Sequence, residues 1–118
     1  MRRPKMEIEK TNSIVLNLLN QLIDSTKNSR IKWSDGSQPN EYFTPLEKIT
    51  VLFSYFSEKE QYRISVMDER GNSQFEKTIS LDDSKLIDSA RSLYEAIVAN
   101  SDNSVKIIND VINLVKKK

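Results

Sequence analysis

The sequence of 118 residues contains no cysteine and no histidine. Their absence excludes disulfide bonds, thiol nucleophiles, the usual zinc sites and the usual general base near neutral pH. Only two glycines are present, Gly36 and Gly71, so no glycine-rich loop can cradle a phosphate group. Apolar runs long enough to cross a membrane are also missing. Many common classes of enzyme and all simple membrane proteins are thereby disfavoured.

Charge is nearly balanced in total but is unevenly distributed along the chain. There are 18 Lys and Arg residues and 17 Asp and Glu residues, a net charge of +1. Six of the basic residues lie at the two ends: Arg2, Arg3, Lys5, Lys116, Lys117 and Lys118. Without these six, 12 basic residues remain against 17 acidic ones, a net charge of −5. A nucleic-acid-binding protein needs a basic face, so this acidic body disfavours that function.

The length indicates a single domain over residues 1–118, since a chain of this size can bury a core without disulfides or metals. We expect residues 1–6 to form a flexible basic tail. A signal peptide would need an apolar stretch after the first basic residues, and Glu7, Glu9 and Lys10 interrupt it. The chain is therefore expected to be cytoplasmic.

Three segments have apolar residues at helical spacing. The first covers about residues 7–28, where Ile14, Leu18 and Leu22 recur at every fourth position. The second is expected to open at residues 82–84, because aspartates and serines favour the positive end of a helix. The third covers about residues 104–116, and its apolar residues occupy more than one face.

Between the first and second helices the pattern changes to strands. Residues 49–56 are rich in β-branched and aromatic side chains, and residues 62–68 and 74–80 alternate between apolar and polar. Short polar turns join them, with Gly71 expected in the left-handed region. Residues 41–44 form a short further strand at most, ended by Pro45. The fold class is α+β: an N-terminal helix, a three- or four-stranded antiparallel meander and two C-terminal helices.

Four short motifs follow the first helix in a recognisable order: Lys32-Trp33, Asn40-Glu41-Tyr42, Asp68-x-x-Gly71 and Leu93-Tyr94. Over residues 12–115 the chain resembles small bacterial α+β domains of unknown function, which recur as stand-alone proteins and in some cases near mobile elements. The resemblance implies the same helix, meander and two-helix order and a bacterial cytoplasmic origin. It implies no site residue and no activity.

Carboxylates are the only plentiful acid–base groups, so an enzyme of this sequence would depend on them. The candidate pairs are Asp82 with Asp83, Asp68 with Glu69, and Glu58 with Glu60. Each pair lies at a helix start or a turn, where it has a local structural role, and neighbouring strand residues point to opposite faces. We therefore expect no catalysis, no cofactor, no bound metal and no small-molecule substrate.

A nucleic-acid accessory protein is the alternative interpretation. Basic residues and aromatic rings of the kind that bind single strands occur at Lys27, Arg30, Lys32 and Trp33, followed by Tyr42 and Phe43. In the competing interpretation, Trp33 closes one end of the core and the basic residues solvate the end of the first helix. The acidic body supports the second interpretation.

Surplus apolar surface is the most informative feature of the sequence. In the strand 49–56, Leu52 and Phe56 lie on the face opposite to the one expected to point into the core. The last helix is apolar over much of its circumference, with Ile107, Ile108, Val111 and Leu114 among its apolar residues. Either the domain sandwiches this helix against its own sheet, or another chain covers these residues. We favour the latter: a non-catalytic protein–protein interaction module that forms a homodimer.

Overall fold

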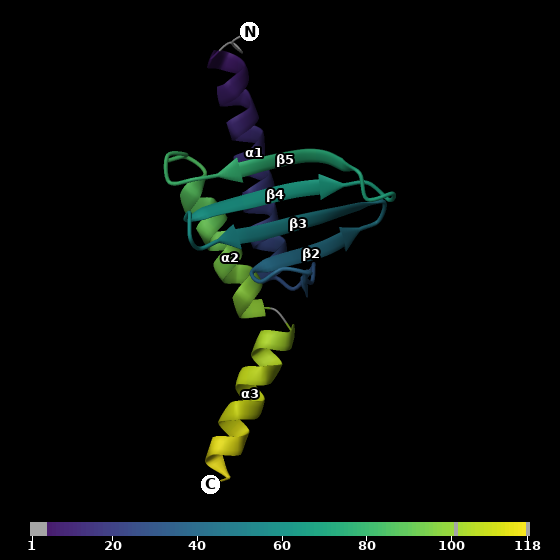
Figure 1. Cartoon of the computed structure of the whole chain (residues 1–118), viewed down its shortest axis with the longest axis vertical. Coiled ribbons are helices and arrows are strands. Elements are labelled where there is room, and N and C mark those ends of the chain that lie inside the picture. Colours follow the sequence, from purple (N-terminus) through teal and green to yellow (C-terminus); the bar gives the residue numbers. More distant parts are fainter. Residues whose placement is uncertain (1–4, 101, 118) are drawn as a thin grey trace.

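A computed structural model describes the backbone of residues 5–100 and 102–117, and the side chains of residues 11–100, 108 and 110–117. The described part of the chain contains three helices (Figure 1). Along the chain, α1 (Lys5–Lys27) comes before the strands, and α2 (Ile87–Asn100) and α3 (Asp102–Lys116) come after them. The strands are β1 (Ser34–Asp35), β2 (Glu41–Leu46), β3 (Ile49–Phe56), β4 (Gln61–Met67) and β5 (Ser73–Ile79). Of the expected tail over residues 1–6, residues 1–4 lie outside the described part, and residues 5 and 6 belong to α1.

The strands form one antiparallel sheet in the order β1-β2-β3-β4-β5. The α+β class and the meander agree with the expectation from sequence, whereas the expected number of three or four strands is too small. β2 continues through Pro45 because β1 pairs only with Tyr42 and Phe43, so the proline faces an unpaired edge where no donor is needed. β3 therefore lies in the middle of the sheet, not at an edge.

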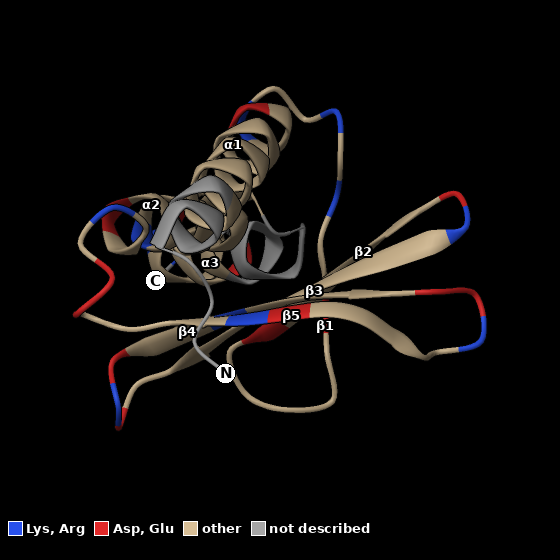
Figure 2. Ribbon diagram, turned by 90° about the horizontal axis from the view of Figure 1, so that it is seen from above, with Lys and Arg blue, Asp and Glu red and all other residues tan. Residues whose placement is uncertain are grey.

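The core lies between one face of the sheet and the two helices α1 and α2, which cover the same side (Figure 2). Alternate residues of the central strands point into it, among them Val51, Phe53 and Ile64, and all three are almost fully buried. Leu19 of α1 and Leu93 of α2 meet them from the helix layer, and both are fully buried. We call this side of the sheet the helix-bearing face.

The opposite side of the sheet, which we call the open face, is not covered by α1 or α2 (Figure 2). The strand register places on it Phe43, Leu52, Phe56, Arg63 and Met67, with serines and threonines between them. The apolar residues of this face are half-buried, apart from Phe56, which is 38% exposed. This face is thus mixed in character, with an apolar centre on β2 and β3.

The described side chains of the last helix, α3, at residues 108 and 110–116, are all exposed and do not pack on the sheet. The helix continues from α2 past the β2 edge and projects along the long axis of the molecule (Figure 1), which measures 64 × 32 × 26 Å. The alternative to self-association, in which one domain sandwiches this helix against its own sheet, is therefore not the arrangement observed.

Candidate functional site

The projecting helix α3 exposes a band of large aliphatic side chains. The exposed fractions of these residues are 57% for Ile108, 52% for Val111, 45% for Ile112, 63% for Leu114 and 68% for Val115. Single exposed apolar residues are normal on protein surfaces, but a contiguous group of this kind marks an interaction surface. Ile107, which was predicted to belong to this surface, lies in α3, but its side chain is outside the described ones.

The spacing of these residues explains why they gather on one side. Ile108, Ile112 and Val115 follow each other at intervals of four and three, so they line one face of the helix, whereas Asp110 and Asn113 point away from it. A helix of 15 residues is only marginally stable on its own in water. Packing of the apolar face is therefore the main source of its stability, and the described aliphatic side chains of this face are exposed within one chain.

Leu52 and Phe56, the other two residues predicted for self-association, lie on the open face of the sheet. Leu52 is half-buried and pairs across the strands with Phe43. The guanidinium of Arg63 lies 4.9 Å from the centre of the Phe56 ring and its Nε atom lies 3.1 Å from a carboxylate oxygen of Glu76. The structure therefore separates the predicted residues into two surfaces on different elements, the open face and the apolar face of α3.

The structure places Trp33 in the core, with only 6% of its surface exposed. Its Nε1–H donates a hydrogen bond to Oγ1 of Thr26. Lys27, Arg30 and Lys32 around it are exposed, and Arg30 lies 3.7 Å from a carboxylate oxygen of Asp24. The indole ring is thus unavailable for stacking on a base unless the core opens.

A cluster of all four tyrosines was not predicted from the sequence. Tyr55 and Tyr62 stack at 4.8 Å between ring centres, and Tyr94 of α2 lies 5.0 Å from Tyr55 and 6.2 Å from Tyr42. Burial raises the pKa of Tyr42, Tyr62 and Tyr94 above the usual value of 10.0, because the charged phenolate would lose hydration. In the sequence, Tyr55 and Tyr62 lie at equal distances from the β3–β4 turn. This spacing could have predicted that the two rings pair across the strands.

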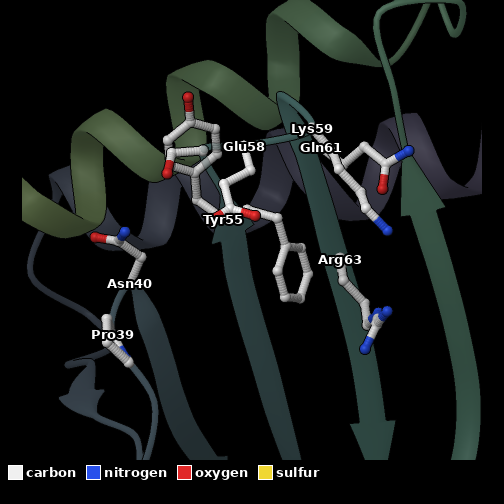
Figure 3. A pocket seen from close by; sticks show the side chains of 9 residues that line it. Pro39, Asn40, Tyr55, Glu58, Lys59, Gln61 and Arg63 are labelled. Carbon is white, nitrogen blue, oxygen red and sulfur yellow. The ribbon is translucent and has the colours of Figure 1, made fainter.

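A shallow pocket of about 300 Å³ lies beside this cluster, between the segment before β2 and the β3–β4 turn (Figure 3). Tyr55 and Asn40 form one wall, and the hydroxyl of Tyr94 donates a hydrogen bond to Oδ1 of Asn40 at 3.0 Å. The labelled side chains of Lys59 and Arg63 stand on the other wall (Figure 3). The charged groups are spread around the rim, and no acid–base pair converges on one point.

Two of the candidate carboxylates are engaged in local structure. Oδ1 of Asp68 accepts hydrogen bonds from the backbone N–H groups of Arg70 and Asn72, both at 2.9 Å. Oδ2 of Asp83 accepts one from the backbone N–H of Ser80 at 2.9 Å. Among the described side chains, at residues 11–100, 108 and 110–117, acidic residues do not gather in a group of three that could hold a metal ion.

Comparison of the chain with family models, curated proteins and solved structures gave no match in any of the three. The resemblance to bacterial domains therefore finds support only in the shared α+β architecture. In the described part of the chain, no helix is both long and apolar enough to span a bilayer.

Proposed function

We propose that the protein is a non-catalytic interaction module that associates with a second copy of itself through α3. The observation that carries this proposal is the band of five exposed aliphatic residues among the described side chains of α3. A helix of this length needs such packing to be stable, and a second copy is always available to supply it.

Charge favours a second copy as the partner. α3 ends at Lys116 and Lys117 follows it, whereas the chain without its basic ends has a net charge of −5. The basic end of one helix is therefore attracted to the acidic body of another copy. If two α3 helices instead packed side by side in parallel, their C-terminal lysines would lie close together and repel each other.

A pair of glutamate substitutions on α3 tests the proposal. Val111→Glu places a charge on the apolar face and should give a folded monomer, because Val111 is already exposed within one chain. Asn113→Glu adds the same charge to the polar face and should leave the dimer intact. Light scattering measures the mass of each variant, and equal masses for the two variants would contradict the proposal.

The alternative function, a nucleic-acid accessory protein that uses the basic ends and the Trp33 region, has less support because Trp33 is buried. It makes a different prediction. Binding to a single-stranded oligonucleotide should fall steeply as salt increases, and replacing Lys116 and Lys117 with alanine should reduce the slope.

A further inference from the structure

We propose that α3 of one copy docks on the open face of the sheet of the other copy, and that the two copies do this reciprocally. The inference rests on the self-association proposed above and specifies which surface covers α3. It joins two apolar surfaces: the exposed α3 band, and the half-buried centre of the open face, which neither α1 nor α2 covers (Figure 2).

In the structure, α3 lies away from the open face of its own chain (Figure 1). α2 packs on the helix-bearing face, and a single residue, Ser101, separates it from α3 in the sequence. One residue spans at most about 3.6 Å, whereas packed layers lie about 10 Å apart on each side of a sheet. α3 leaves on the helix side of the sheet, past the β2 edge (Figures 1 and 2). Cover by another chain requires no change in the connection between α2 and α3.

The area available on α3 decides between two ways of building a dimer. The five exposed side chains each offer roughly 100 Å², which gives on the order of 500 Å² per chain if two α3 helices pair only with each other. A stable interface buries about 800 Å² on each partner. If each chain contributes both its helix and its open face, the buried area per chain roughly doubles and exceeds this requirement.

The open face has the chemistry to receive an aliphatic helix. Leu52 and Phe43 form its apolar centre, and Ser54 and Ser65 lie beside Leu52 on the neighbouring positions of β3 and β4. Because the serine side chains are small, they leave space beside Leu52 in which isoleucine and valine side chains of a docked helix can pack. The ion pair of Arg63 and Glu76 lies toward β5, where it can border the docked helix.

Two-fold symmetry makes the contact reciprocal and closed. Because α3 projects past the β2 edge, a second copy can lie next to that edge with its open face turned toward α3 (Figure 1). The two-fold rotation that relates the copies also places α3 of the second copy on the open face of the first. Such an isologous arrangement closes on itself and produces a dimer rather than a filament.

Cysteine trapping tests the proposal directly, since the natural chain contains no cysteine. Ser65→Cys marks the open face and Ile112→Cys marks the apolar face of α3. The two full-length variants, one carrying an affinity tag, are mixed, left to exchange subunits and oxidised. A disulfide forms only when the two Cα atoms come within about 7 Å. We expect the mixed disulfide to exceed links between two identical chains at least tenfold.

Control variants and the alternative outcomes keep the two proposals separate. Asn113→Cys, on the polar face of α3, should give only background links with Ser65→Cys. If Ile112→Cys chains link mainly to each other while the mass is that of a dimer, the helices pair alone; docking on the open face is then wrong and self-association stands. If every variant is monomeric, both proposals fail. Thr50→Cys on the same face replaces Ser65→Cys if emission from Trp33 shows that the latter is unfolded.

Discussion

The indole Nε1–H of Trp33 donates a hydrogen bond to Oγ1 of Thr26, 2.9 Å away, in the interior of the protein. The same hydroxyl donates its own hydrogen to the backbone oxygen of Leu22 at 2.6 Å. Both residues are almost completely buried. This short chain of hydrogen bonds attaches the segment after α1 to the end of the helix and explains why the only tryptophan is found in the core.

Replacing Thr26 with valine should destabilise the protein by about 1–3 kcal/mol, because a buried indole N–H would lose its acceptor while the shape of the side chain is preserved. Urea denaturation followed by Trp33 emission measures the change. Thr26→Ser keeps the hydroxyl and is the matched control, with a smaller loss. Equal free energies of unfolding for Thr26→Val and the natural protein would show that the hydrogen bond contributes nothing to stability.

The tyrosine cluster should make stability depend on alkaline pH. In the folded protein, burial raises the pKa of Tyr42, Tyr62 and Tyr94 above 10.0, so the unfolded chain releases these protons first as the pH rises. Their contribution to stability is complete below about pH 10 and is lost as the pH rises through the folded pKa values. The free energy of unfolding should therefore begin to fall near pH 10 and continue to fall as the pH rises through the raised pKa values of the folded state.

The control for this pH dependence is Tyr94→Phe, which removes one of the three groups with a raised pKa. The decrease in the free energy of unfolding over the same pH range should be smaller in this variant. A spectrophotometric titration of the natural protein should also show tyrosinate forming later than in the unfolded chain. Identical pH dependence in the two proteins would contradict the assignment to this cluster.

The β4–β5 turn is expected to need both Asp68 and Gly71. The carboxylate of Asp68 accepts two backbone hydrogen bonds, and Gly71 has a φ of 85°, in the left-handed region. Asp68→Ala and Gly71→Ala should each lower the free energy of unfolding by about 1 kcal/mol. Glu69→Ala, in the same turn, should have almost no effect. Thermal denaturation distinguishes these outcomes, and a stability loss confined to Glu69→Ala would be inconsistent with the turn as described.

The meander was largely predictable because its signals are local. The strand predicted at residues 49–56 has the same bounds as β3. The strands predicted at 62–68 and 74–80 have the observed lengths of β4 and β5, but each is displaced by one residue toward the C-terminus. The left-handed conformation expected at Gly71 is present. In these segments alternation of apolar residues, strand propensity and turn residues all indicate the same structure.

The errors occur where tertiary contacts decide the structure. β1 is only two residues long and lies in a polar, turn-like segment. The local pattern of apolar and polar residues therefore does not indicate that it pairs with β2. α2 begins at Ile87 rather than at residues 82–84, because Asp83 bonds back to Ser80 in a turn ahead of the helix. The sequence also showed that α3 has excess apolar surface, but its position away from the sheet depends on packing between elements.

Dimer formation should couple stability to protein concentration. If only the folded chain associates, the melting temperature rises as the concentration increases. Val111→Glu should remove this dependence and melt at the same temperature over a hundredfold dilution, whereas Asn113→Glu should behave like the natural protein. A concentration-dependent melting temperature in Val111→Glu would place the interface away from the apolar face of α3.

The most direct test of self-association is the mass of the full chain, measured by light scattering on a sizing column at low and at high salt. We predict a mass of twice 13.7 kDa that persists at high salt, because salt would screen only the charged border of an apolar interface. A mass of 13.7 kDa at every concentration and salt condition would contradict the account and leave α3 without the partner proposed for it.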